Sequence, residues 1–213
     1  MNVTIIGTGN MARGIATRLL AGGNGVTLVG RAPGKAKDLA TQLQGTVRGG
    51  ATVTAVDGDA FPGEIVVLAV PYPAMAPLVA QYAPQLAGKI VVDISNPIDF
   101  EALESIVAPG SSAAEELALS APAGAKIVKA FNTTFAGALL AGQVAGQPLD
   151  VFIAADDVEA KAAVAELAET GGLRPIDAGA LRCARQLEAM GLLHIKLQFT
   201  LGTGFASSMK LLV

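Results

Sequence analysis

The chain has 213 residues, which is near the upper limit for one domain and short for two. Apolar residues make up 52% and charged residues 15%, which indicates a folded protein with a large aliphatic core; the formal net charge of −3 gives no general attraction to nucleic acid or anionic membranes. The single Cys183 excludes an internal disulfide framework and a cysteine-rich metal site. The residues after Met1 lack the pattern of a signal peptide, and apolar runs such as Ile65 to Val70 are too short to span a bilayer. We therefore expect a cytoplasmic protein that binds neither nucleic acid nor membrane and holds no metal.

Short β-branched runs alternate with Ala- and Leu-rich segments of helical period, which predicts an α/β fold with a mainly parallel sheet and helices on both faces. Strands are expected at about Val3 to Ile6, Val26 to Val29, Val53 to Val56, Ile65 to Val70, Ile90 to Ile94, Ile127 to Phe131, Val151 to Ala154 and Pro175 to Asp177. Helices are expected at about Met11 to Ala21, Lys35 to Gln44, Ala74 to Leu86, Ala113 to Leu117 and Val158 to Thr170. A helical extension should run from about Leu181 to the C-terminus, with a break around Gly202 and Gly204. The predicted organisation is one domain over residues 1–179 and the extension over 180–213.

A glycine-rich turn follows the first strand and opens the first helix, where a dinucleotide fingerprint requires it. It reads Gly7-Thr8-Gly9-Asn10-Met11-Ala12. Gly7 permits the tight turn, Gly9 lets the backbone approach a pyrophosphate, and Ala12 allows the helix to pack close to the strand. Free N–H groups and the helix dipole would then bind the anion. The alternative is an ordinary glycine turn, but the strand, turn and helix together favour a doubly wound, Rossmann-type domain.

The second strand ends in Gly30-Arg31, where NAD-specific folds place Asp or Glu. Arg31 and Lys35, one helical turn later, could bind a 2′-phosphate with a guanidinium fork and an ammonium group. This favours NADP over NAD. The alternative is that both are solvated surface charges.

The loops after the next strands should surround the nicotinamide, because ligands in such sheets lie over the carboxyl ends of the strands. These loops read Val70-Pro71-Tyr72, Ser95-Asn96-Pro97 and Asn132-Thr133-Thr134. Short polar residues and prolines there suit a ring pocket, although Pro71, Asn96 and Pro97 are also ordinary loop starters.

Reduction of a carbonyl normally needs a positioned proton donor, and no such donor stands out in this sequence. The single histidine, His194, lies among apolar residues and is expected to be packed or interfacial. Asp93, inside a strand, is expected to be a buried structural carboxylate. Tyr72 is the better-placed candidate donor, and no other catalytic residue is assigned.

Three stretches resemble the NADP-dependent oxidoreductases of the deazaflavin coenzyme F420, including bacterial members. These are Gly7-Thr8-Gly9-Asn10-Met11, Val128-Lys129-Ala130-Phe131-Asn132-Thr133, and Gly172-Leu173-Arg174-Pro175-Ile176-Asp177-Ala178-Gly179 with Leu181 and Arg185. The last two are also similar to the cytosolic domain of membrane ferric reductases. The resemblance covers nearly the whole chain. This chain differs from the archaeal enzymes in three places. It lacks their extra glycine in the first turn, it has Tyr72 where tryptophan is frequent, and its loop from Phe131 to Phe135 is closer to the ferric-reductase pattern.

The resemblance implies that Thr8 to Met11 line the pyrophosphate, that Arg31 and Lys35 bind the 2′-phosphate, and that backbone from Thr133 to Ala136 fixes the nicotinamide. It also implies a homodimer with the C-terminal helices at the acceptor site. An apolar stripe at four-residue spacing independently favours a dimer contact. Its members are Leu193, Leu197, Leu201, Phe205 and Met209.

The leading hypothesis is hydride transfer between NADP(H) and a flat, flavin-like acceptor such as coenzyme F420 or a flavin. After the last strand only about 36 residues remain, too few for the second domain that reductases of small substrates generally use. An open slot is therefore expected. The alternatives are an NADP-linked reductase of a small imine or ketone, with Tyr72 or water as the proton donor, and a module that senses NADP without turnover.

Overall fold

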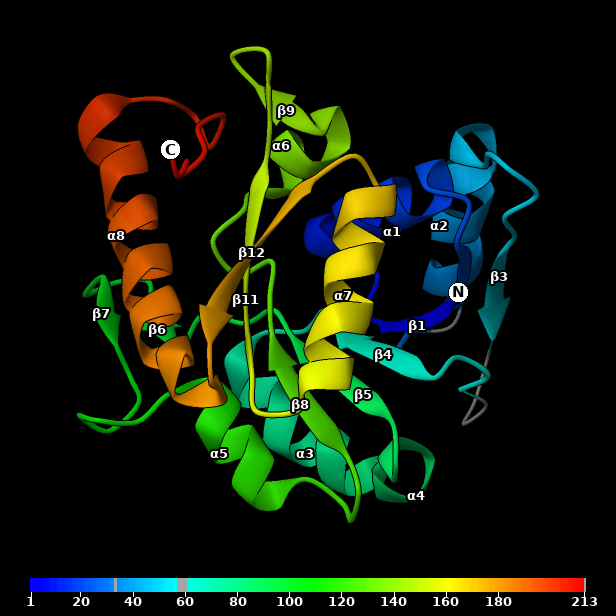
Figure 1. Cartoon of the computed structure of the whole chain (residues 1–213), viewed down its shortest axis with the longest axis horizontal. Coiled ribbons are helices and arrows are strands. Elements are labelled where there is room, and N and C mark those ends of the chain that lie inside the picture. The colour runs from blue at the N-terminus through cyan, green and yellow to red at the C-terminus, as the bar shows by residue number, and fades with distance from the viewer. Residues whose placement is uncertain (33, 57–60, 213) are drawn as a thin grey trace.

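The computed structural model describes residues 1–32, 34–56 and 61–212. Its centre is a twisted eight-stranded sheet with the order β12-β11-β8-β5-β4-β1-β2-β3 (Figure 1). These strands are β1 (Asn2–Ile6), β2 (Gly25–Val29), β3 (Val53–Val56), β4 (Ile65–Leu68), β5 (Ile90–Asp93), β8 (Lys126–Lys129), β11 (Asp150–Ala155) and β12 (Arg174–Gly179). From β3 to β8 all neighbours are parallel. This is the doubly wound order, which confirms the predicted fold class and directs attention to the carboxyl ends of the strands.

Helices cover both faces of the sheet, and each layer has its own apolar core. One layer contains α1 (Asn10–Ala21), α2 (Lys35–Leu43), α6 (Ala136–Ala141) and α7 (Val158–Thr170). The other contains α3 (Met75–Gln81), α4 (Ala83–Leu86) and α5 (Ala113–Ser120), with the long α8 (Ala184–Leu201) along the side of the molecule. Along β4, Ile65 and Val67 belong to the first core and Val66 and Leu68 to the second, as the two-residue period of a strand requires.

The segment predicted as one helix from Ala74 to Leu86 forms two helices, α3 and α4, separated at Tyr82. Tyr82 has φ −105° and ψ 19°, outside helical geometry. Pro84 explains the break, because it has no N–H group and its ring would clash with the carbonyl of Ala80 in a continuous helix.

The C-terminal helix ends earlier than predicted. α8 stops at Leu201, and Gly202 closes it in the left-handed conformation with φ +62°. The residues that follow form no helix, so Phe205 and Met209 do not continue the apolar stripe of α8. The predicted helical run beyond the glycine is therefore wrong, and Val213, its last residue, lies outside the described residues.

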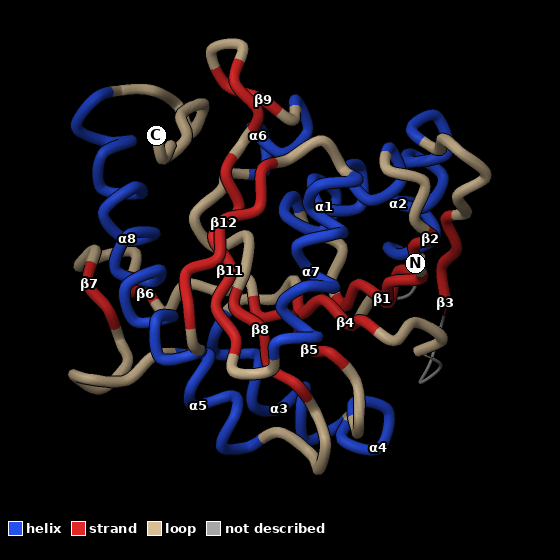
Figure 2. The backbone as a smooth tube through the Cα atoms, in the orientation of Figure 1, coloured by secondary structure: helices blue, strands red, loops and turns tan. Residues whose placement is uncertain are grey.

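Several short elements were not predicted (Figure 2). They are α6, the hairpin of β6 (Ile98–Asp99) and β7 (Glu104–Ser105), the hairpin of β9 (Gln143–Val144) and β10 (Gln147–Pro148), and the 3₁₀ turns Gln44–Thr46 and Tyr72–Ala74. The 3₁₀ turn Leu181–Cys183 opens the predicted helical extension. Strands of two residues and helices of three to six residues show too little hydrophobic period to be detected from sequence.

Two strands run against the rest of the sheet. β11 pairs with β8 in the antiparallel sense, with Ala154 opposite Lys129, and β12 is parallel to β11. Their first residues, Asp150 and Arg174, therefore lie beyond the carboxyl ends of the parallel strands. This reversal brings the two residues to the edge where a ligand is expected.

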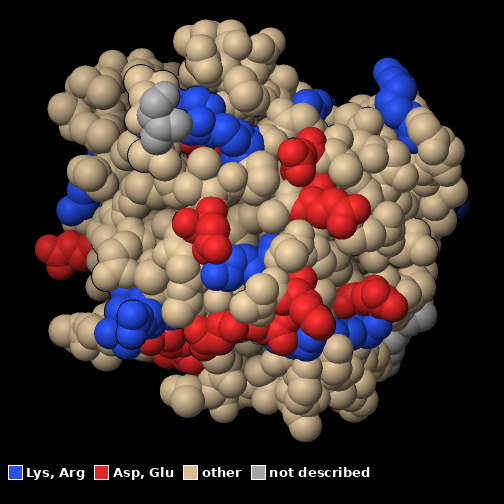
Figure 3. Space-filling model, in the orientation of Figure 1, with Lys and Arg blue, Asp and Glu red and all other residues tan. Residues whose placement is uncertain are grey.

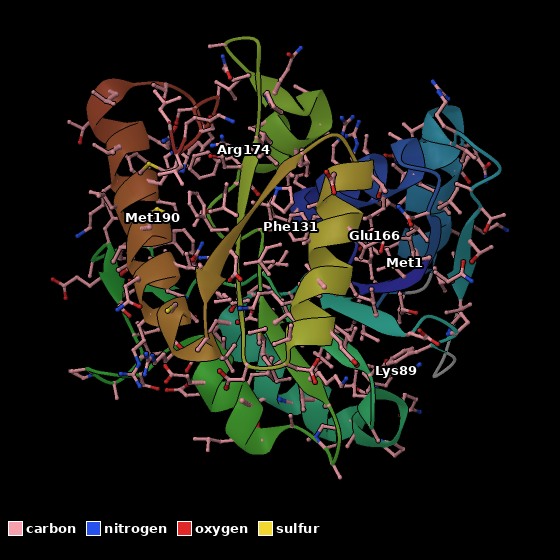
Figure 4. The ribbon with its side chains drawn as sticks, viewed as in Figure 1. Met1, Lys89, Phe131, Glu166, Arg174 and Met190 are labelled. Atoms are coloured by element: carbon pink, nitrogen blue, oxygen red, sulfur yellow. The ribbon has the colours of Figure 1, made fainter. Side chains whose placement is uncertain are left out.

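The C-terminal segment (residues 203–212) is anchored at Asp150. Arg174 donates two hydrogen bonds to this carboxylate, Nε to Oδ1 at 2.8 Å and Nη2 to Oδ2 at 2.6 Å. Lys210 Nζ lies 2.6 Å from Oδ1 and the amide of Leu211 2.8 Å from Oδ2. Figure 4 shows Arg174 near the start of β12, beside the returning chain. The segment is thus tied to the strand ends by a buried carboxylate.

Positive and negative side chains are interspersed on the surface shown in Figure 3. Several of them form ion pairs, including Lys126 with Asp157 and Arg185 with Glu115. Within residues 1–32, 34–56 and 61–212, no helix has the length and apolar character needed to cross a bilayer.

Asp150 should make stability depend on pH in a defined direction. Burial raises the pKa of this carboxyl, but hydrogen bonds from Arg174, Lys210 and Leu211 outweigh it and lower the pKa from 3.8 to about 2. A depressed folded-state pKa gives stability that is present above pH ~4 and lost as pH falls towards ~2. Asp150→Asn should therefore cost roughly 2 kcal/mol of unfolding free energy at neutral pH, with the difference from wild type shrinking near pH 3. Urea unfolding measures this, and a difference independent of pH would contradict it.

Candidate functional site

The glycine turn between β1 and α1 leaves no room for a side chain at its first position. Gly7 has φ +125°, and an added Cβ would lie 2.2 Å from the carbonyl oxygen of Ala69 on the neighbouring strand end. Its N–H donates to Val29 O at 2.9 Å. Gly7 is therefore required by the fold itself.

Gly9 has a different environment. It lies directly before α1 with an ordinary φ of −81°, and an added Cβ would meet no protein atom within 4 Å. The fold does not need glycine here, so the space in front of the turn is free for a bulky group. A pyrophosphate fits this space, because the first N–H groups of α1 have no partner within the helix.

Gly30 was not assigned a role from the sequence, although it borders the same turn. An added Cβ would lie 3.1 Å from the amide nitrogen of Ala36 and 3.2 Å from Cγ2 of Thr8. Gly30 thus permits the close approach of the first turn and the start of α2. Arg31 and Lys35 follow on this side, and both are exposed. Arg31 directly follows Gly30, and Lys35 directly precedes Ala36, the residue whose amide adjoins Gly30.

The remaining predicted residues surround the strand ends at different depths. Asn10 and Pro71 are exposed; Thr8, Met11, Val70, Tyr72, Asn96 and Ala136 are half-buried; Pro97, Asn132 and Thr133 are buried. The first turn is linked to the β4 end by the contact of Gly7 with Ala69. The β5 and β8 ends are linked to each other by hydrogen bonds.

Asn96 and Asn132 form this link. Asn132 Nδ2 donates to Asn96 Oδ1 at 3.0 Å, and Asn96 Nδ2 donates to Asn132 O at 2.7 Å. Asn132 Nδ2 also donates to the carbonyl of Leu187 on α8 at 2.9 Å. The pair fixes both loops against α8, so Asn96 does more than start a loop, which was the alternative left open by the sequence.

Beneath these loops lies a fully buried lysine. Lys129 Nζ contacts Asp93 Oδ2 at 2.7 Å, Glu188 Oε1 at 2.8 Å and Ser95 O at 2.6 Å. Asp93 also accepts the N–H of Ser95 at 2.7 Å, which confirms that it is a buried, hydrogen-bonded carboxylate. Glu188 accepts the amide of Ala113, the first residue of α5. Burial raises the pKa of Glu188, and the charge of Lys129 opposes this shift.

Tyr72, the candidate proton donor, is engaged elsewhere. Its hydroxyl donates to Glu116 Oε2 at 2.5 Å, and both residues border a cavity of about 210 Å³ lined by α3 and α5 residues. The hydrogen bond to Glu116, with a further contribution from burial, raises the pKa of Tyr72 to about 12. A phenol with this pKa is a weak acid at neutral pH.

His194 is buried, as expected for a packed residue. Its Nδ1 lies 3.2 Å from Thr133 O and its Nε2 2.8 Å from Ser207 Oγ. Burial lowers the pKa of the imidazole, although the bond to Thr133 opposes this. The sequence did not indicate that this histidine contacts the Thr133 turn, because the two residues are 61 positions apart.

Comparison with known proteins identifies similar chains. A family model described as "NADP oxidoreductase coenzyme F420-dependent" matches residues 2–97. The chain is 32% identical over 211 residues to F420-dependent NADP reductase from Methanothermobacter thermautotrophicus, which covers 92% of this chain and 89% of that protein. It is 39% identical over 193 residues to metalloreductase STEAP3 from Rattus norvegicus; this match covers 89% of the chain but spans only 36% of that protein. A solved structure described as a "putative F420 dependent NADP-reductase" from Arthrobacter sp. FB24 is 32% identical, with a TM-score of 0.80 and 99% of both chains covered.

Gly7→Ala should destabilise the protein strongly. The new methyl group would overlap the Ala69 carbonyl in a backbone conformation that disfavours L-residues. We expect a loss of about 2–3 kcal/mol in unfolding free energy, measured by urea titration. Gly45→Ala is the matched control, because a Cβ there meets nothing within 4 Å and it should change stability by less than about 0.5 kcal/mol. Equal stabilities for the two variants would contradict the assigned role of Gly7.

Proposed function

The chain belongs to the family of F420-dependent NADP reductases and is an NADP-dependent oxidoreductase, and on this premise we propose that it transfers a hydride between NADP(H) and a flat, flavin-like acceptor such as deazaflavin coenzyme F420 or a flavin.

The observation that carries this proposal is that both candidate proton donors are already committed. The Tyr72 hydroxyl donates to Glu116, and the His194 N–H that faces the strand ends is directed to Thr133 O. Carbonyl or imine reduction needs an acid that can protonate the product. A conjugated ring needs none from the enzyme at the moment of transfer, because the negative charge it gains is delocalised. The residue inventory therefore favours a flavin-like acceptor over a small ketone or imine.

The proposed coenzyme site follows from the geometry of the first turn. Gly7 shapes the turn, and the space in front of Gly9 admits the pyrophosphate, with Thr8, Asn10 and Met11 along its sides. Arg31 and Lys35 would bind the 2′-phosphate. The nicotinamide would lie among the strand ends, which supply Val70, Pro71, Tyr72, Asn96, Pro97, Asn132, Thr133 and Ala136.

NADPH bound at this site would supply a hydride, two electrons with one proton, leaving NADP⁺, and the acceptor ring that gains the hydride would take its further proton from water. The protein contributes orientation. The Asn96–Asn132 pair holds two strand ends in a fixed relation, and α8 supports both. Misplacement of reacting atoms by about 1 Å can cost about 100-fold in rate, so this rigidity is relevant to catalysis.

We also propose a homodimer formed through α8 and a cytoplasmic location. Leu193 and Leu201, about two helical turns apart on this helix, are exposed by half or more and form an apolar surface that a second copy could cover. The single cysteine is consistent with a reducing compartment. The division of the chain into a coenzyme-binding domain (residues 1–179) and a C-terminal extension (residues 180–213) is also a prediction.

Arg31→Ala should remove most of the preference for NADPH over NADH. Hydrogen bonds to charged groups contribute about 1.5–3 kcal/mol, so NADPH affinity should fall about ten- to a hundredfold while NADH affinity stays unchanged. Isothermal titration measures both. Lys37→Ala, which removes an exposed lysine of α2 to which no 2′-phosphate contact is assigned, should have little effect. Equal affinity of wild type for the two coenzymes would refute the 2′-phosphate assignment.

Wild-type protein loaded with NADPH should reduce the deazaflavin or a flavin in stopped-flow mixing, and Tyr72→Phe should retain that rate within about threefold. General acids contribute about 10²–10⁴-fold, so a catalytic Tyr72 would reveal itself by a much larger loss. Small ketones and imines should not be reduced. Reduction of a ketone that disappears in Tyr72→Phe would move the assignment to a carbonyl reductase. NADPH binding without transfer to any acceptor would favour a sensing module.

A further inference from the structure

One face of α8 lies along the ends of β5 and β8. The carbonyl of Leu187 accepts a hydrogen bond from Asn132, and His194 contacts Thr133 two helical turns further on. Between them, Gly191 approaches Asn96 so closely that an added Cβ would be 2.5 Å from its Oδ1. Three residues at helical spacing thus contact the loops that the proposed function assigns to the nicotinamide.

The hydrogen bonds of His194 determine its tautomer. A carbonyl oxygen can only accept, so the proton must be on Nδ1, which faces Thr133 O at 3.2 Å. In the neutral ring Nε2 is then an acceptor. The hydroxyl proton of Ser207 has two acceptors within reach, Nε2 at 2.8 Å and Gln198 Oε1 at 3.1 Å, and we assign it to the nearer Nε2, because Gln198 Oε1 already accepts from Thr203. Gln198 Nε2 donates to Ser207 Oγ at 2.8 Å and to the carbonyl of His194 at 2.8 Å. The imidazole therefore connects the Thr133 turn to the C-terminal segment.

Aromatic packing adds a second connection between the same two parts. The ring of Phe135, two residues after Thr133, lies 4.3 Å from the His194 ring at an interplanar angle of 35°. Phe205 from the C-terminal segment meets Phe135 edge-on at 5.1 Å. The Phe135–Phe205 pair has the separation and edge-on geometry of a favourable aromatic contact, and the Phe135 and His194 rings lie closer still.

Thr133 has no second polar anchor of its own. Its Oγ1 is buried and has no hydrogen-bond partner among the described residues, whereas its carbonyl accepts from His194. Phe131, two residues earlier, has φ +62°, an unusual conformation for a residue with a side chain. Figure 4 shows Phe131 deep in the molecule, near the end of β8. Within this segment Thr134 donates twice to the carbonyl of Phe131, from its N–H at 3.1 Å and from Oγ1 at 2.7 Å, which closes the turn that precedes Phe135. The contact of the Thr133 carbonyl with His194 adds an anchor from outside the segment.

We propose that His194 is a positioning residue for hydride transfer: by donating from Nδ1 to the Thr133 carbonyl while accepting from Ser207, it fixes the turn from Thr133 to Ala136 and makes the orientation of the nicotinamide depend on the C-terminal segment. This inference rests on the proposed function, because it takes that turn to be the nicotinamide site. His194 does not donate a proton to substrate in this role, since both ring nitrogens are engaged within the protein.

Two substitutions separate the hydrogen bonds of the histidine. His194→Phe keeps a ring against Phe135 but removes both bonds. His194→Asn places an amide N–H where Nδ1–H was, so it retains the bond to Thr133 and loses the bond to Ser207. Thr200→Val, at an exposed position of the same helix, is the matched control. Circular dichroism and thermal melting identify any variant that fails to fold, in which case His194→Asn and Ser207→Ala carry the test.

Three measurements are made on each folded variant: single-turnover reduction of the deazaflavin by NADPH, the dissociation constants of NADPH and of 2′-phospho-ADP-ribose, which lacks the nicotinamide, and the fluorescence anisotropy decay of bound NADPH, whose fluorophore is the reduced nicotinamide. His194→Phe should slow transfer about 10–100-fold and add fast local motion to the bound ring. The affinity for 2′-phospho-ADP-ribose should stay within about threefold of wild type. His194→Asn and Ser207→Ala keep the bond to Thr133 and lose the connection through Ser207, so each should slow transfer less than His194→Phe does, by about 3–10-fold. Thr200→Val should match wild type, and wild-type rates in both His194→Asn and Ser207→Ala would overturn the dependence on the C-terminal segment.

The outcomes distinguish this inference from the function it rests on. Unchanged transfer rate and anisotropy decay in His194→Phe would overturn the positioning role, as would an equal loss of affinity for NADPH and for the fragment. If wild type binds NADPH but reduces no acceptor, hydride transfer fails as the function while the anisotropy decay still decides the role of His194. If wild type does not bind NADPH at all, both proposals fail.

Discussion

One buried ammonium group determines how the helices meet the sheet. Lys129 has no exposed surface, and its three contacts come from Asp93, Ser95 and Glu188. Because Glu188 also accepts backbone N–H groups at the start of α5, the interaction joins β5, β8, α5 and α8 at one point. Loss of one partner from a buried ion pair costs about 3–5 kcal/mol, since an uncompensated charge is left inside. The position of α8, and with it the shape of the candidate site, depends on this contact.

The position of α8 matters for the candidate site, because this helix contacts the loops at the ends of β5 and β8 and the lysine beneath them. Leu187 contacts Asn132, Glu188 contacts Lys129, and Gly191 makes room for Asn96. Within two helical turns, α8 thus makes a hydrogen bond through a backbone carbonyl, an ion pair and a close backbone contact. The loops after β5 and β8 are therefore held both by the hydrogen bonds between Asn96 and Asn132 and by contacts with this helix.

The sequence was sufficient to predict the eight strands of the main sheet, the fold class and the glycine turn between β1 and α1, because each depends on local period or on neighbouring residues. Pairing direction was not predictable for β11, since an apolar run reads the same in either direction. The break at Tyr82 could have been inferred from Pro84. The contacts of Lys129 with Asp93 and Glu188 and of His194 with Thr133 could not, because they join residues far apart in the chain whose side chains look ordinary in isolation. Gly30 was read only as a neighbour of Arg31, although its lack of a side chain is what lets α2 approach the first turn.

The reversal of β11 and β12 has a practical consequence for attaching anything to this protein. It brings Asp150, Arg174 and the C-terminal segment to the edge that carries the candidate site, so a label or linker fused there would compete with the anchoring contacts. At the opposite edge, exposed turns at Gly88 and Gly124 precede β5 and β8. The two turns are adjacent, because a Cβ added at Gly124 would lie 3.4 Å from the Cα of Gly88. Surface immobilisation, for example on an electrode that recycles the coenzyme, is best designed through those turns, which leave the strand ends facing solution.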